Sequence, residues 1–132
     1  MSQENVEIAR AALDALNRGD GDAAFKDMAP DFEYDFSRSI GFQRGVYKVD
    51  EARRIWEEFA STWESSRWEA DEFIEADEHV VTPLTMSVRG RDGIEVQALR
   101  TAWVWTFRDR RVARITFYQE RQEALEAAGL RE

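Results

Sequence analysis

The sequence predicts an α+β domain in which three N-terminal helices pack on one face of a mixed or antiparallel sheet. In the first half of the chain, apolar residues recur with helical spacing, and in the second half they alternate with polar residues as in strands. Short connections separate the later strands, and strands joined in this way form an antiparallel meander. The expected order is therefore helix, helix, strand, helix and then four strands.

Three helices are expected in the N-terminal half of the chain. The first covers residues 3–17, and the second covers residues 23–28 and is ended by Pro30. Asp50 is placed to cap a third helix over residues 51–64. The apolar stripe of this third helix consists of Ala52, Ile55, Trp56, Phe59 and Trp63.

The first predicted strand covers residues 31–36, where acidic and aromatic residues alternate. Because successive side chains of a strand point to opposite faces of the sheet, Glu33 and Asp35 share one face and the aromatic residues share the other. The later strands cover residues 68–76, 79–89, 94–108 and 112–119, and a terminal helix covers residues 122–128.

The long strand over residues 94–108 has two distinct faces. The first carries Leu99, Thr101, Trp103, Trp105 and Phe107, and the second carries Val96, Ala98, Arg100, Ala102 and Val104. The second face is apolar apart from Arg100 and would be exposed to water in a monomer, so we interpret it as a homodimer surface. The same outward parity is expected for Val112, Arg114, Thr116 and Tyr118.

Composition limits the classes of function. The length of 132 residues predicts a single domain over residues 1–132, and the net charge of −9 argues against binding to nucleic acid or to anionic membranes. Cysteine is absent and His79 is the only histidine, which excludes thiol chemistry and sites with several histidines. With no signal-like or membrane-spanning apolar run, the expected location is cytoplasmic.

Acidic residues gather between positions 64 and 78, where Arg67 is the only basic residue. A metal site needs oxygen ligands that point to one place. Successive side chains of a strand point to opposite faces, so these acids would lie on both faces. We therefore expect a solvated edge strand and no metal site. His79 follows this segment and is interpreted as a residue of a surface turn.

Several segments carry a resemblance to a known family. They are SQENVE (2–7), NRGD (17–20), APDFE (29–33), GVY (45–47), VWTFRD (104–109) and EALEAAGL (123–130). With the order of elements, they make the chain similar to the SnoaL-like branch of the nuclear transport factor two-like superfamily. The resemblance implies a cone-shaped sheet with an internal pocket and a homodimer formed through the outer face of the sheet. The superfamily includes isomerases, cyclases, hydrolases, dehydratases and non-catalytic binding modules, so the fold alone does not choose a function.

Asp35 is the candidate catalytic residue, because its position resembles that of the general base of ketosteroid isomerase. The alternative is that Glu33 and Asp35 lie on a solvated face. The rest of the isomerase site is missing, since the position of its tyrosine falls on Ala12 and that of its protonated acid falls on Trp103. Without these oxyanion donors, steroid isomerase activity is not expected.

The resemblance also implies which residues line the pocket. The candidate ligand-binding residues are Trp56, Phe59, Leu84, Met86, Leu99, Thr101, Trp103 and Trp105. They would form an apolar cavity for a flat hydrophobic molecule, with indole N–H groups as sparse polar contacts. The alternative is a core that these large rings fill.

Two classes of function follow. The first is a cofactor-free acid/base enzyme of the isomerase, cyclase or dehydratase type, acting on a small hydrophobic molecule with Asp35 as base. The second is a non-catalytic ligand-binding or vestigial-pocket dimer, and the surroundings of Asp35 discriminate between the two. Chemistry like that of an epoxide hydrolase is a weaker alternative, because it needs an Asp–Arg–Asp arrangement and the segment Arg100-Thr101-Ala102 lacks the second acid.

Overall fold

Helices and strands follow the expected order apart from an additional two-residue strand before the third helix and a break in the strand expected over residues 68–76. A computed structural model describes residues 2–38 and 45–130, without the side chains of residues 97–99. The helices are α1 (Ser2–Arg18), α2 (Gly21–Phe25), α3 (Val49–Thr62) and α4 (Arg121–Ala127). The strands are β1 (Met28–Asp35), β2 (Val46–Tyr47), β3 (Ser65–Ala70), β4 (Ile74–Ala76), β5 (His79–Arg89), β6 (Glu95–Arg108) and β7 (Arg111–Tyr118).

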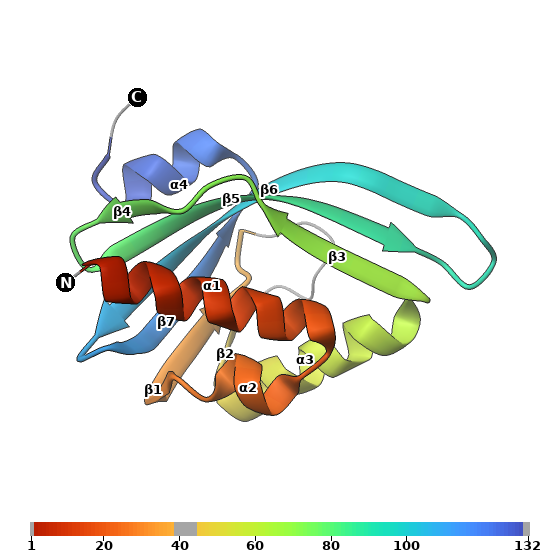
Figure 1. Ribbon diagram of the computed structural model, residues 1–132, viewed down its shortest axis with the longest axis horizontal. Coiled ribbons are helices and arrows are strands. Elements are labelled where there is room, and N and C mark those ends of the chain that lie inside the picture. Colours follow the sequence, from red (N-terminus) through yellow and green to blue (C-terminus); the bar gives the residue numbers. More distant parts are fainter. Residues whose placement is uncertain (1, 39–44, 131–132) are drawn as a thin grey trace.

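The strands form one strongly curled, mixed sheet (Figure 1). Its order is β2-β1-β7-β6-β5-β3, and β4 pairs with β5 beside β3. Strands β5, β6 and β7 are antiparallel neighbours, as the short connections predict, whereas β1 runs parallel to β7. The two-residue turn between β6 and β7 has positive φ at Asp109 and Arg110, which is the conformation of a tight hairpin turn. The mixed α+β fold predicted from the sequence is thus confirmed.

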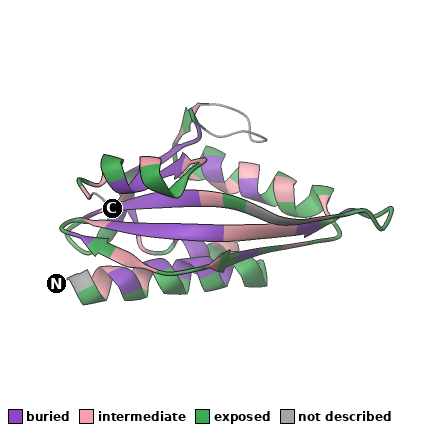
Figure 2. Cartoon of the chain, turned by 90° about the horizontal axis from the view of Figure 1, so that it is seen from above, coloured by how far each residue is buried: buried purple, intermediate pink, exposed green. Residues whose placement is uncertain are grey.

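The main core lies between helices α1 to α3 and the concave face of the sheet. Phe32, Tyr34 and Phe36 are almost completely buried in it, as the alternation along residues 31–36 predicts. The central strands β5 and β6 contribute Val80, Leu84, Trp103 and Trp105 from the same side. Figure 2 shows the buried residues concentrated in these strands, with α1 and α4 on opposite sides of the sheet.

Several element boundaries differ from the expectation. Helix α2 ends at Phe25, and β1 begins at Met28 and contains Pro30. Pro30 lacks an N–H for a strand ladder, and it lies where the pairing of β1 with β7 is irregular, between Met28 and Glu33. The strand expected over residues 68–76 is two strands, β3 and β4, which both pair with β5. The predicted cap also differs, because Lys48 occupies the N-cap position of α3 and Asp50 lies inside the helix.

The apolar outer face of β6 is partly covered within the chain. Ala102 and Val104 pack with Val81 against Ala124 and Leu125 of α4, so a dimer is not needed to bury them. The sequence predicts the terminal helix but not its docking on this face. Val112 was expected on the outer face of the sheet, and this is wrong. Thr106 pairs with Arg114 and the next residue of β6, Phe107, pairs with Val112, so β7 has one extra residue at this point. The extra residue turns the Val112 side chain into the main core.

The acidic segment lies at an edge of the sheet, as expected. Strand β3 ends the strand order and pairs only with β5 among the described strands. Glu69 and Asp71 are exposed there, and charges on an edge strand oppose pairing with another chain. No helix in the described part of the chain has the length and apolar character needed to cross a membrane.

Candidate functional site

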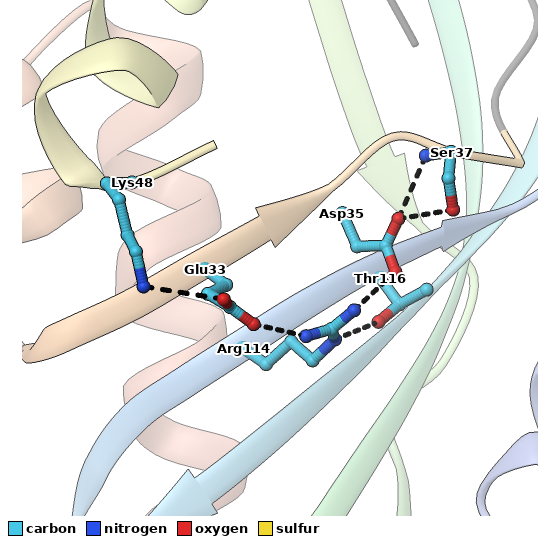
Figure 3. A network of polar contacts seen from close by, with 6 residues as sticks. All are labelled: Glu33, Asp35, Ser37, Lys48, Arg114 and Thr116. Atoms are coloured by element: carbon cyan, nitrogen blue, oxygen red, sulfur yellow. Dashed lines mark hydrogen bonds and ion pairs between the residues drawn. The ribbon is translucent and has the colours of Figure 1, made fainter. Parts of the chain in front are cut away.

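Asp35 lies at the end of β1 on the face of the sheet opposite the aromatic core. Its carboxylate accepts hydrogen bonds from the amide and the hydroxyl of Ser37, at 2.9 and 2.6 Å, and from Nη2 of Arg114, at 2.6 Å. The other terminal nitrogen of Arg114 donates to Glu33 (Figure 3). Arg114 therefore bridges the two carboxylates of β1, and Glu33 also accepts from Lys48 at 3.4 Å.

The register of two parallel strands explains this arrangement. Glu33 pairs with Arg114 and Asp35 pairs with Thr116, so residues of one parity on β1 and β7 share the outer face. Nε of Arg114 points to the Thr116 hydroxyl at 3.4 Å, which helps to hold the guanidinium between the two acids (Figure 3). We call Glu33, Asp35, Ser37 and Arg114 the outer ion-pair network.

The electrostatics keep Asp35 ionised. Burial disfavours the charged form, but hydrogen bonds from the Ser37 hydroxyl and amide and from Arg114 outweigh it, so the pKa of Asp35 lies below its ordinary value. A general base benefits from a pKa near the working pH, and a carboxylate with a lowered pKa and three donors is a weak proton acceptor. The sequence alone does not decide which face of the sheet carries the Asp35 side chain. In the structure it is the outer face.

Two of the aromatic residues predicted to line a pocket, Trp103 and Trp105, pack in the core. Trp103 and Trp105 are completely buried, and Trp103 stacks on Phe117 with ring centroids 4.4 Å apart. Leu84 is also fully buried, and Met86 is packed against the same core. In this part of the concave face, large rings fill the space, which is the alternative that the sequence left open. The indole nitrogens of Trp103 and Trp105 have no hydrogen-bond partner within the described residues.

A cavity of about 330 Å³ lies nearby, between the end of α1, helices α2 and α3, and strand β3. Its apolar lining includes Leu16, Phe25, Trp56, Phe59 and Trp68. Its polar lining includes Asp20, Asp22, Arg53, Glu57 and Ser66. We call this space the helical cavity. Pockets of this volume are large enough for a small organic molecule.

The helical cavity brings together only some of the residues predicted for the site. Trp56 and Phe59 line it, whereas Leu84, Met86, Trp103 and Trp105 belong to the core beneath. Thr101 is half-buried on β6 and donates its hydroxyl to the carbonyl of Tyr118 at 2.8 Å. The side chain of Leu99 lies outside the described residues.

Sequence reasoning missed the polar rim and one aromatic wall of the cavity. A signal was present in α3, where Arg53, Trp56, Glu57 and Ala60 recur at helical spacing and so share one side of the helix. Trp68 could be found only from the fold, because it reaches the cavity from β3. Among the residues that the structure describes, no three acidic or histidine side chains gather in a way that could hold a metal ion. His79 is half-buried at the start of β5, with Nδ1 3.0 Å from the Thr106 hydroxyl.

Comparisons with known proteins agree with this architecture. The curled sheet with helices on its concave face is the fold of nuclear transport factor two-like and ketosteroid isomerase-like proteins. The model of the SnoaL-like domain matches residues 9–115, and the chain belongs to this family. No curated protein matches the chain.

Three solved structures illustrate the range of proteins that share the fold. An NTF2-like protein of unknown function from Burkholderia pseudomallei has 23% identity and a TM-score of 0.76, over 93% of this chain and 95% of that one. A putative polyketide cyclase from Sinorhizobium meliloti has 21% identity and a TM-score of 0.67, over 84% of this chain and 93% of that one. A hypothetical protein from Catenulispora acidiphila, in complex with trimethylamine, has 15% identity and a TM-score of 0.73, over 95% and 94%.

Proposed function

We propose that this protein is a non-catalytic module that binds a small, largely apolar molecule in the helical cavity. The observation that carries the proposal is the cavity of about 330 Å³ with Trp56, Phe59 and Trp68 in its wall. Aromatic walls with a few polar groups at the rim are typical of small-molecule sites. The trimethylamine complex of a protein with the same fold supports the idea that a small molecule can be held by such a scaffold.

The position of Asp35 supports a binding role over a catalytic one. Its carboxylate is engaged by Ser37 and Arg114 and does not line the helical cavity. An acid/base enzyme needs its base within hydrogen-bond reach of the substrate. The enzyme hypothesis makes a different prediction, namely that Asp35→Asn abolishes turnover and leaves the melting temperature nearly unchanged.

Ligand binding is expected to change the intrinsic fluorescence, because Trp56 and Trp68 line the cavity. A panel of small aromatic and alicyclic molecules would be titrated into the wild type and into Ala60→Phe, which adds a ring at the exposed edge of the cavity. We expect a saturable shift for the wild type and at least a tenfold loss of affinity for the variant, since the added ring occupies ligand volume.

The matched control is Ala127→Phe, an exposed position on α4, on the opposite face of the sheet. This control should bind like the wild type. Equal affinity of Ala60→Phe and the wild type, or no fluorescence shift with any compound, would contradict binding in the helical cavity.

We also propose that the protein is a homodimer through the part of the outer sheet face that α4 leaves uncovered. Half-buried Thr85 and exposed Arg100 pair with each other on that part, and such mixed surfaces occur at the rims of dimer interfaces. Val96 was expected on the same face, but an extra residue in β6 pairs it with Val88 and turns it to the concave side. Light scattering at micromolar concentration should give twice the chain mass of 15.4 kDa. A mass of one chain would overturn this proposal.

A further inference from the structure

The charges at the rim of the helical cavity are unequal. Three carboxylates, those of Asp20, Asp22 and Glu57, line it with a single guanidinium, that of Arg53. Arg53 donates to Asp22 from across the gap between α3 and α2. Asp20 accepts from the amide of Ala23 at the start of α2 and lies 3.7 Å from Arg18.

Glu57 is the third carboxylate of the rim, and it takes part in none of these pairings. It is exposed on α3, and it has no ion pair within 4.0 Å among the described residues. Arg53, the cation that could neutralise it, is held by Asp22, and this hydrogen bond is the main reason that the pKa of Arg53 is raised. The charge of Glu57 also raises the pKa of Arg53, so the two side chains attract each other, but Glu57 forms no ion pair within 4.0 Å among the described residues and its exposed carboxylate is open to a ligand.

The wall beneath the rim is made of π-systems. The ring centroids of Trp56 lie 6.0 Å from Phe59 and 5.3 Å from Trp68, and those of Phe59 and Trp68 are 5.8 Å apart. All three rings line the cavity. The negative electrostatic potential of an aromatic face attracts a cation, and tryptophan gives the strongest attraction of the three ring types.

We infer that the ligand of the helical cavity is an organic cation, an amine or quaternary ammonium compound with an apolar body. The inference rests on the proposed function and names its ligand class. The apolar body would pack on Trp56, Phe59 and Trp68, and the positive charge would lie toward Glu57. An anionic ligand would be repelled by Glu57, and a neutral one would gain nothing from it, because the other two rim carboxylates are paired with arginines. The net charge of −9 also raises the local concentration of cations around the molecule.

The test compares two probes of the same shape by ligand-observed NMR. Benzyltrimethylammonium carries the positive charge, and neopentylbenzene is its neutral isostere. We expect the cation to bind the wild type about tenfold more tightly, because both the rings and Glu57 attract it. Raising the salt concentration from about 0.05 to about 0.5 M should lower the affinity for the cation and leave the affinity for the neutral probe nearly unchanged.

Two variants locate the charge that matters. Glu57→Gln should weaken benzyltrimethylammonium binding about fivefold and leave neopentylbenzene binding unchanged. The matched control is Glu58→Gln, the adjacent exposed acid on α3, which does not line the helical cavity. This control should bind both probes as the wild type does.

The outcomes separate the inference from the proposed function. If both probes bind with equal affinity, or if Glu57→Gln has no more effect than Glu58→Gln, the cavity binds ligands without regard to charge and the inference is overturned while the proposed function stands. If neither probe binds, both are overturned. Tighter binding of the cation that depends on Glu57 supports both.

Discussion

Replacing Trp103 by alanine is expected to lower the free energy of unfolding by about 3–5 kcal/mol, the range for removing a large aromatic side chain from a packed core. Trp103 is completely buried and stacks on Phe117. It also lies within 6 Å of the Trp56, Trp68 and Trp105 rings, so its loss leaves a cavity at the centre of the aromatic cluster. Urea unfolding followed by circular dichroism measures the effect.

Trp103→Phe is the informative control. It keeps a ring in the stack and removes an indole N–H that has no hydrogen-bond partner in the described residues. Burying such a group without a partner costs about 1–3 kcal/mol, so its removal should offset much of the lost packing, and we expect a net loss below about 2 kcal/mol. If Trp103→Ala cost less than about 1.5 kcal/mol, the ring would not be part of a close-packed core.

Arg114→Ala should have the second largest effect, a loss of about 2 kcal/mol near neutral pH. The Asp35 side chain is 11% exposed, so removing its guanidinium partner leaves a largely buried carboxylate with the Ser37 donors alone. Breaking a fully buried pair costs about 3–5 kcal/mol, and the 37% exposure of Arg114 reduces this through solvent screening.

The matched control is Arg108→Ala, which breaks an arginine–aspartate pair with Asp31 at the surface. Its side chains are 55% and 62% exposed, so solvent screens this pair and its loss should destabilise the fold much less than the loss of Arg114. Equal losses for the two variants would show that the outer ion-pair network adds no more than an ordinary surface contact.

The dependence on pH follows from the lowered pKa of Asp35. A carboxyl group whose pKa is lower in the folded state stabilises the fold above its unfolded pKa of about 3.9. This stabilisation is lost as the pH falls through the folded value. The difference in stability between the wild type and Arg114→Ala should therefore be constant above about pH 5 and shrink below about pH 4.

Asp35→Asn distinguishes a structural from a catalytic aspartate. The ion-pair geometry predicts that this variant lowers the stability and that most of the effect of Arg114→Ala disappears in the double variant, because the two side chains act as a pair. A catalytic base would instead show lost turnover with an unchanged melting temperature.

Local patterns in the sequence were enough for most elements and for the core side of β1. The alternation over residues 31–36 put Phe32 and Tyr34 in the core because a strand has a strict period of two. The bounds of β5 agree with the predicted residues 79–89 for the same reason. Helical spacing put Trp56 and Phe59 on one apolar stripe of the third helix, and both rings line the helical cavity.

Contacts between distant segments decided the rest. Asp35 meets Arg114 across 79 positions of sequence, and only the parallel pairing of β1 with β7 brings them together. Similarly, the docking of α4 buries Ala102 and Val104, and the irregular pairing of β6 with β7 turns Val112 inward. By itself the sequence determined the periodicity of each element, because that depends on neighbouring residues. The tertiary structure decided what each face meets, including the partner of Asp35 and the cavity between α1, α3 and β3, because those contacts join residues that no local pattern relates.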